Sequence, residues 1–321
     1  MKCTNRTHHL KIKLLCISCI AALFMNGCGT GKTADIQNPY SLTGDNSSVS
    51  NQFFARNLCV TNDINFGTDQ VHADYAEGAG VFDLTTKEVL YSQNLFEKLY
   101  PASTTKILTC IVAMEQCKPD EVVTFSAKAA SQPKVHLGAK KGEQFYMQDL
   151  WYGLMLESYN DCAYAIAEHV AGSAEKFAAL MNEKAKKIGC TDSHFVTPNG
   201  LDAKDEQGEH HTTAYDLCRI MSYCAWKSPV SKQFLEVTQT RSHTFQSLEG
   251  TGYAVSNKNA LLDMMDHVIT GKTGYTSKAG YCYVAALEEG GRHYAIALLA
   301  CGWPNHKSWK WHDAKLLYEY G

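Results

Sequence analysis

The pattern of apolar and polar residues predicts strands near both ends of the chain and helices between them. Residues 79–93 (AGVFDLTTKEVLYSQ) contain two apolar runs separated by a polar Thr85-Thr86-Lys87 turn, as in a β-hairpin. Farther along, apolar residues recur at helical spacing. The segments with this spacing are residues 103–117, 147–157, 160–171 and 173–188.

Strand patterns return near the carboxyl end. Residues 268–274, 280–287 and 294–301 read as strands, with a turn at Gly290-Gly291, and a polar, aromatic helix is expected over about 305–320. The economical arrangement is an α+β fold. It has one antiparallel sheet formed from both ends of the chain, helices on the faces of the sheet, and a helical subdomain inserted in the middle.

The amino-terminal 27 residues have the pattern of an export signal. Residues 1–13 carry four basic side chains and no acid, and residues 14–25 form an almost unbroken apolar run that is too short to span a bilayer. The run ends at Met25-Asn26-Gly27-Cys28, which resembles a bacterial lipoprotein cleavage site. We therefore predict a lipoprotein signal peptide over 1–27 and a lipid on Cys28, at the outer face of the cytoplasmic membrane. Ordinary signal cleavage nearby is the alternative.

Composition and charge narrow the classes of partner. With 45% hydrophobic and 20% charged residues the chain is ordinary for a globular protein. Residues 28–53 are rich in Gly, Ser, Thr and Asn and are expected to be a flexible tether, so residues 54–321 would form the folded domain. Without residues 1–27 the chain has 26 basic and 33 acidic side chains, a net charge of −7. Nucleic acid is therefore not an expected partner, and membrane attachment would rest on the lipid at Cys28.

Thirteen cysteines are unusual for a chain of this kind. Three leave with the signal peptide and Cys28 would carry lipid, so nine remain, an odd number that cannot all pair within one chain. Several of them occupy apolar positions of predicted helices or strands, and we expect them to be mostly free and buried. No CxxC or HExxH pattern occurs, and no metal or other cofactor is expected.

The strongest chemical signal is an SxxK motif at the start of a predicted helix. A spacing of three places Ser103 and Lys106 on one helix face, with Cβ atoms about 5–6 Å apart. Serine becomes a nucleophile when a base takes its proton, and lysine can be that base only if burial or a nearby cation lowers its pKa. Two further SxxK matches carry less weight. Pro133 disfavours a helix over 131–134, and Ser173 is better explained as a helix N-cap.

Two more motifs follow Ser103 in a fixed order. Ser158-Tyr159-Asn160 lies between two predicted helices, and Lys272-Thr273-Gly274 lies in a predicted strand. SxxK, SxN and KTG in this order are the signature of serine penicillin-binding proteins and β-lactamases. Three short motifs in order are far more specific than any one of them.

From about residue 77 onward the chain resembles the serine-type D-alanyl-D-alanine carboxypeptidases, which are low-molecular-mass penicillin-binding proteins. The resemblance includes PASTTK at 101–106, HFVTPNGLD at 194–202, HHTTAYDL at 210–217 and GKTGYTSKAGYC at 271–282. It implies a β-lactamase/transpeptidase-like fold with a five-stranded antiparallel sheet. Residues 54–321 would be the penicillin-binding catalytic domain, without the carboxy-terminal β domain or amphipathic anchor of many relatives.

The resemblance also implies roles for individual residues. Ser103 would attack the peptide bond between two D-alanines and Lys106 would take its proton. Ser158 and Asn160 would relay the proton and hold the peptide. Lys272 and Thr273 would bind the terminal carboxylate, Gly274 would let the strand approach the peptide, and the backbone N–H groups of Ser103 and Tyr275 would form the oxyanion hole. The partners would be peptidoglycan stem peptides ending in D-Ala-D-Ala, with β-lactams as covalent inhibitors.

Three residues depart from the family pattern. Tyr159 stands where Gly is expected, Cys162 where Ala is usual, and Asn199 where His is expected. None of them removes a catalytic side chain, but Tyr159 leaves the specificity open, because it could narrow the cleft or stack on substrate. His210 and His211 are expected to have a structural or cleft-lining role.

Three alternatives to a carboxypeptidase remain. A D,D-endopeptidase shares all three motifs. A class A β-lactamase would carry an ExxLN loop, and none occurs between Asn160 and Lys272. A lipoprotein without catalytic activity could bind muropeptide or penicillin as a sensor, although its motifs would have no need to stay intact.

Overall fold

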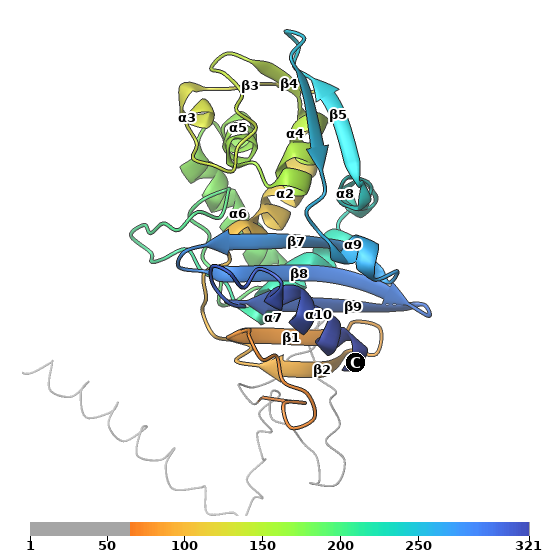
Figure 1. Cartoon of the computed structure of the whole chain (residues 1–321). Coiled ribbons are helices and arrows are strands. Elements are labelled where there is room, and N and C mark those ends of the chain that lie inside the picture. Colours follow the sequence, from red (N-terminus) through yellow and green to blue (C-terminus); the bar gives the residue numbers. More distant parts are fainter. Residues whose placement is uncertain (1–64, 321) are drawn as a thin grey trace, which may run out of the picture. The chain divides into compact units, whose positions relative to one another are not determined.

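The predicted antiparallel sheet is present and is built from both ends of the chain (Figure 1). The computed structural model describes residues 65–320. The strands run in the order β2-β1-β9-β8-β7, and every neighbouring pair is antiparallel. Their bounds are β1 (Gly78–Asp83), β2 (Glu88–Gln93), β7 (Val268–Thr276), β8 (Gly280–Glu289) and β9 (Arg292–Leu299). The α+β class, the five strands and the hairpin at 85–87 are as the sequence predicts.

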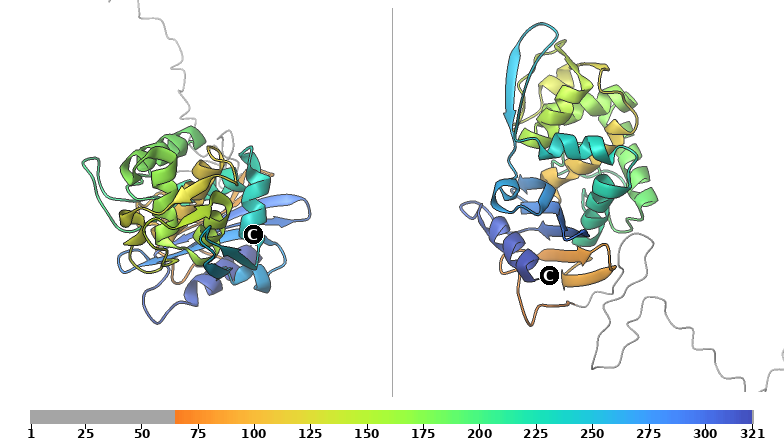
Figure 2. Two further views of the ribbon diagram at one scale, coloured as in Figure 1. Left: turned by 90° about the horizontal axis from the view of Figure 1, so that it is seen from above. Right: turned by 90° about the vertical axis from the view of Figure 1, so that its right-hand side faces the viewer.

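Both faces of the sheet are covered by helices, as the almost continuous burial of its strands requires. Successive strand residues point to opposite faces. Phe82 therefore packs into the core shared with α7 (Ala214–Ser222), whereas Val81 packs into a second core beneath α10 (Trp309–Tyr320). The right-hand view of Figure 2 shows these two helices on opposite sides of the sheet.

The middle of the chain is helical, as its spacing predicts. The expected helices over 160–171 and 173–188 are α5 (Asn160–Ala171) and α6 (Ala174–Ile188). Gly172 ends α5 in the left-handed conformation with φ of 80°, and the Ser173 side chain accepts a hydrogen bond from the Lys176 N–H and starts α6. The remaining helices here are α2 (Lys106–Met114), α3 (Ala127–Ala130), α4 (Met147–Tyr152) and α8 (Ser231–Gln239).

Two small hairpins and a short helix are not predicted by the sequence pattern. They are β3 (Val122–Thr124) with β4 (Gln144–Tyr146), β5 (Ser242–Gln246) with β6 (Gly252–Ser256), and α9 (Leu261–Met264). In β5 and in β6 only one residue of five is buried. A strand this exposed has no apolar alternation to reveal it. The helices α7 and α8 likewise fall in a stretch for which the sequence predicts no element.

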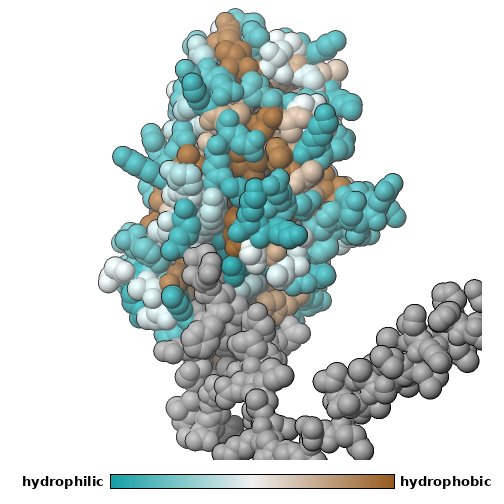
Figure 3. Space-filling view, turned by 180° about the vertical axis from the view of Figure 1, so that it is seen from behind, coloured by the Kyte–Doolittle hydropathy of each residue, from teal (hydrophilic) through white to brown (hydrophobic). Residues whose placement is uncertain are grey.

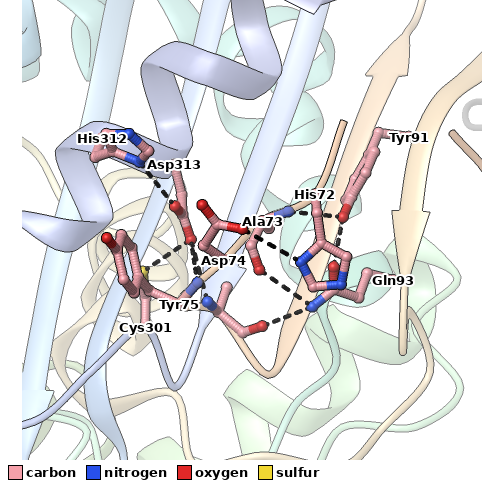
Figure 4. A network of polar contacts seen from close by, with 10 residues as sticks. His72, Ala73, Asp74, Tyr75, Tyr91, Gln93, Cys301, His312 and Asp313 are labelled. Carbon is pink, nitrogen blue, oxygen red and sulfur yellow. Dashed lines mark hydrogen bonds and ion pairs between the residues drawn. The ribbon is translucent and has the colours of Figure 1, made fainter. Parts of the chain in front are cut away.

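A polar network fixes the segment before β1 against the sheet and α10 (Figure 4). The buried carboxylate of Asp313 accepts hydrogen bonds from the backbone N–H groups of Tyr75 and Ala76, at 3.0 and 3.1 Å. From β2, the Gln93 amide donates to the carbonyl oxygens of Ala73 and Ala76. Backbone groups that no strand pairs with are thus satisfied by buried side chains.

The described cysteines are free, as expected. Seven are buried and Cys117 is partly exposed. Burial among apolar neighbours raises the thiol pKa, to about 12 for Cys282, so these side chains behave as small hydrophobic residues. The buried ones are Cys110, Cys162, Cys190, Cys218, Cys224, Cys282 and Cys301.

The surface seen in Figure 3 is mostly hydrophilic, with apolar patches across its middle and upper part. Between residues 65 and 320, no helix combines the length and the apolar character needed to cross a bilayer. The expected signal peptide (1–27), Cys28, the tether (28–53), Cys59 and the first residues of the expected domain all lie outside the described residues.

His210 lies in the loop that precedes α7 and is buried between residues 196–197 and the turn that begins α2. Its Nδ1 accepts the Val196 N–H at 3.0 Å, so its Nε2 carries the proton and donates to Thr105 Oγ1 at 2.9 Å. Burial lowers the pKa of His210 to about 3, and the imidazole is neutral in the folded protein. The expected structural role of this histidine is therefore to hold the loop against the helix that carries Lys106.

Acid should destabilise the fold through His210. The unfolded chain takes up a proton near pH 6.5 and the folded chain only near pH 3, so the free energy of unfolding should fall as the pH drops through that interval. The slope from this group alone approaches about 1.4 kcal/mol per pH unit. The free energy of unfolding, measured by urea unfolding at several pH values in this range, should change less with pH in His210→Asn than in the wild type. An equal pH dependence in the two proteins would contradict a neutral, buried His210.

Candidate active site

Ser103 and Lys106 meet within a single turn at the start of α2. Ala102–Thr105 form a 3₁₀ turn, η1, which continues directly into α2. Ala102 has a φ of 48°, a left-handed conformation that is costly for a residue with a Cβ. The Lys106 Nζ lies 2.8 Å from the Ser103 Oγ. The predicted nucleophile and base are thus in hydrogen-bond contact.

The Lys106 amine is fully buried and surrounded by oxygen atoms. It lies 2.9 Å from the Asn160 Oδ1 and 2.6 Å from the Asn199 carbonyl oxygen. Burial and the nearby Lys272 ammonium lower the pKa of Lys106 well below its usual value. The neutral amine, which is the form that can take a proton, is therefore favoured.

Ser158 and Asn160 are brought to the cleft by a break between two helices. The π-helical turn η2 (Gly153–Glu157) follows α4 and ends at Ser158, which has a φ of 68°. Asn160 is the first residue of α5, and its side chain spans from Lys106 to the Pro133 carbonyl oxygen, to which its amide donates at 3.0 Å. Strained residues of this kind cluster at functional sites.

Lys272, on the edge strand β7, is the second buried lysine of the site. Its Nζ donates to the Ser158 Oγ at 3.0 Å and to the Thr273 carbonyl oxygen at 2.9 Å. Burial lowers the pKa of Lys272 to about 7. Two hydrogen-bonded pairs, Lys106 with Ser103 and Lys272 with Ser158, therefore make up the site, and the charge of Lys272 acts on Lys106 through space.

Gly274 allows β7 to lie directly against the turn that carries Ser103. A Cβ at this position would sit 2.9 Å from both the Ser103 nitrogen and the Pro101 carbonyl oxygen. The next residue, Tyr275, is 38% exposed and its ring lies over that of Tyr281, with centroids 4.6 Å apart. The two backbone N–H groups predicted for the oxyanion hole thus belong to segments in contact.

Two residues that support the site are missed by the motif analysis. Asn199 stands where the family pattern has His, and its backbone carbonyl oxygen contacts Lys106. The neighbouring Gly200, with φ of 78°, makes this approach feasible, because a Cβ there would sit 1.9 Å from the Ala102 carbonyl oxygen. In the sequence, Pro198-Asn199-Gly200 is typical of a tight turn and is the one local feature that points to this approach.

The second is Asp161, which is fully buried behind the SxN motif. Its two carboxylate oxygens accept the backbone N–H groups of Leu137 and Gly138, at 2.8 and 2.9 Å. The loop at Leu137 and Gly138 is thereby tied to the first turn of α5, next to Asn160. No local pattern marks this role, because its partners lie 23 and 24 residues away.

Tyr159 packs into the helical region. Its ring lies against Gly153, where a Cβ would be 3.2 Å from the Tyr159 Cδ2, and burial raises the pKa of its hydroxyl to about 12. Its effect on specificity stays a prediction.

The geometry suits acyl transfer on a substrate that carries a negative charge. A hydroxyl in contact with a buried neutral amine can act as a nucleophile, and a buried lysine that is charged can bind a carboxylate. Among residues 65–320, none of these side chains belongs to a cluster of metal-ligating groups.

Comparison with known proteins gives a consistent family. Residues 66–300 match the family model described as D-alanyl-D-alanine carboxypeptidase. The chain is 34% identical over 245 residues to D-alanyl-D-alanine carboxypeptidase DacB2 of Mycobacterium tuberculosis, a match that covers 75% of this chain and 80% of that protein. It is 30% identical over 241 residues to DacF of Bacillus subtilis. That match covers 74% of this chain and 60% of DacF, so the chain spans only part of some relatives.

Solved structures agree. The crystal structure of a D-alanyl-D-alanine carboxypeptidase from Mycobacterium tuberculosis superposes with a TM-score of 0.70 at 31% identity, covering 77% of this chain and 90% of that one. The Streptomyces K15 DD-transpeptidase gives 0.68 at 27% identity, covering 77% and 96%. With the family model matched over most of its length, the chain belongs to the D-alanyl-D-alanine carboxypeptidase family.

Proposed function

We propose that this protein is a serine-type D-alanyl-D-alanine carboxypeptidase that removes the terminal D-Ala from peptidoglycan stem peptides. The observation that carries the proposal is the 2.8 Å contact between the Ser103 Oγ and the fully buried Lys106 amine, whose pKa is lowered by burial and by the nearby Lys272. Family membership supports the same substrate class.

In the acylation step, neutral Lys106 takes the proton of Ser103 as the Oγ attacks the carbonyl carbon of the penultimate D-Ala. The negative charge that develops on the carbonyl oxygen is stabilised by the N–H groups of Ser103 and Tyr275. Each such donor is typically worth about 10²–10³ in rate. As the C–N bond breaks, the proton on Lys106 passes through the Ser158 hydroxyl to the leaving D-Ala amine.

Lys272 and Thr273 select a substrate that ends in a carboxylate. Lys272 is 2% exposed, so its charge is poorly solvated before substrate binds and is compensated when a carboxylate arrives. The peptide lies along the edge strand β7, where Gly274 allows a close approach. Water then attacks the acyl-enzyme, with Lys106 again taking the proton. A β-lactam would acylate Ser103 by the same route, and no cofactor takes part.

The rival activities differ in what the acyl-enzyme accepts and releases. An endopeptidase would release a cross-linked peptide in place of free D-Ala. The likeness to a DD-transpeptidase makes an amine a second candidate acceptor beside water. A class A β-lactamase would hydrolyse penicillin rapidly, and a sensor would bind it without turnover.

Export and anchoring belong to the same proposal. Residues 1–27 would be removed and Cys28 lipidated, which would hold the enzyme at the outer face of the cytoplasmic membrane beside its substrate. The basic start, the short apolar run and the following Asn-Gly-Cys support this.

Replacing the nucleophile should abolish the chemistry. Ser103→Ala is expected to lose D-Ala release from a soluble peptide ending in D-Ala-D-Ala by about 10⁶-fold, the scale seen when a serine hydrolase loses its nucleophile. Covalent labelling by fluorescent penicillin should also disappear.

The chain provides a matched control for this variant. Ser173 also begins an SxxK sequence, but its hydroxyl caps α6. Ser173→Ala should keep full labelling and lose only about 1 kcal/mol of stability. Labelling that survives Ser103→Ala would refute the assignment. If the wild type is labelled by penicillin but releases no D-Ala, an endopeptidase or a sensor would be favoured.

The pH dependence of kcat/KM should be bell-shaped. It rises as Lys106 loses its proton, and it falls near pH 7 as free Lys272 loses the charge that binds the carboxylate. The alkaline limb of kcat should lie higher, because a bound carboxylate favours the charged lysine. Lys272→Arg, whose side chain stays charged, should remove the alkaline limb from kcat/KM. An alkaline limb that persists in this variant would assign it to another group.

Loss of the lipidated cysteine should release the protein. Cys28→Ser is expected to move the full chain from the membrane to the soluble exported fraction, measured by fractionation and penicillin labelling. Cys59→Ser, a cysteine in the same amino-terminal part of the chain, should stay membrane-bound. Unchanged retention of Cys28→Ser would mean that the lipid is not the anchor.

A further inference from the structure

Three potential metal ligands meet on the helical side of the molecule, outside the active site. The Sγ of Cys117, a carboxylate oxygen of Glu121 and a ring nitrogen of His169 all lie within 4.8 Å of one another. Cys117 follows α2, Glu121 directly precedes β3, and His169 is in the last turn of α5. Among the described residues this is the one such group.

The donor set is one that zinc prefers. Zn²⁺ binds thiolate, imidazole and carboxylate at about 2.0–2.3 Å, so its ligand atoms are about 3.3–3.8 Å apart in a tetrahedral site. The Glu121 Oε2 and the His169 Nε2 are already 2.9 Å apart. Small side-chain rotations would therefore be enough to place an ion between the three groups, with water in the fourth position.

The surroundings favour a cation at this point. The ends of α2 and α5 both lie here, and the carboxyl end of a helix carries a partial negative charge. The other carboxylate oxygen of Glu121 accepts the Lys118 N–H at 2.7 Å, which orients the Oε2 toward His169. The His169 and Glu121 side chains are 26% and 37% exposed, so an ion can enter from solvent.

We propose that Cys117, Glu121 and His169 form a Zn²⁺ site that joins the far ends of the two helices whose first residues line the cleft. Lys106 begins α2 and Cys117 follows its last residue, Met114, which lies about 12 Å along the helix axis from Lys106. The ion is thus too far away to touch the reacting atoms. The site is therefore structural, and it is independent of the proposed peptidase activity. Spacings of 4 and 48 residues match no metal motif, which explains why the sequence predicts no metal.

Cobalt provides a direct readout of the thiolate ligand. The full chain, stripped of metal and kept reduced, should bind Co²⁺ with a thiolate-to-cobalt charge-transfer band in the near ultraviolet that saturates at one ion per chain. Zn²⁺ should displace the cobalt and raise Tm, with a further rise for each tenfold increase in free zinc. Cys117→Ser should lose the band, and His169→Gln should weaken binding by at least about 100-fold.

The His194–Asp205 pair serves as the matched control. The His194 Nε2 lies 2.8 Å from the Asp205 Oδ1, a histidine–carboxylate contact like that of His169 and Glu121, but no cysteine joins this pair. His194→Gln should keep the cobalt band and the zinc-dependent rise in Tm. Absence of the band in the wild type, or its survival in Cys117→Ser, would overturn the site. The metal-free protein should still be labelled by penicillin. If metal removal abolished the labelling, the ion would not have the purely structural role proposed here.

Discussion

The burial of the Lys106 amine is the constraint on which the rest of the site depends. A charged ammonium in this position would be expensive, and the surroundings favour the neutral form. A neutral amine has two N–H donors and one lone pair. The oxygens of Asn160 and Asn199 can only accept, so they take the two donors, and the lone pair is left facing the Ser103 hydroxyl. The packing thus selects both the protonation state and the direction in which the base points.

The second buried lysine, Lys272, couples substrate binding to this base. Lys272 lowers the pKa of Lys106, and burial lowers its own to about 7. A bound carboxylate would offset the charge of Lys272 and keep it protonated. The charge of Lys272 acts on Lys106 through space, so a change in the charge of Lys272 also changes the pKa of Lys106. Binding of the substrate's terminal carboxylate and activation of Ser103 therefore depend on the same pair of lysines.

The sequence predicts the parts of this arrangement that are local. Apolar periodicity locates the sheet strands and the helices α5 and α6, and the order of the three motifs singles out Ser103 among three SxxK matches. It does not predict the contact of Lys106 with the Asn199 carbonyl oxygen, which joins residues 93 positions apart. Nor does it reveal the β5–β6 hairpin, whose exposed strands have no apolar alternation. Such features arise from tertiary packing, where any backbone oxygen can serve and side-chain identity carries little signal.

Two strained backbone positions beside the catalytic groups need close packing to hold them in place. Ala102 and Ser158 both have positive φ, a conformation that costs about 1–3 kcal/mol each and persists only where neighbours enforce it. Gly200 packs against Ala102 so closely that no side chain fits between them, and β7 closes the other side through Gly274. The helices that carry Lys106 and Asn160 must then hold their own positions against these contacts. A metal ion at the far ends of both helices would add to the stability of the fold and leave this geometry unchanged.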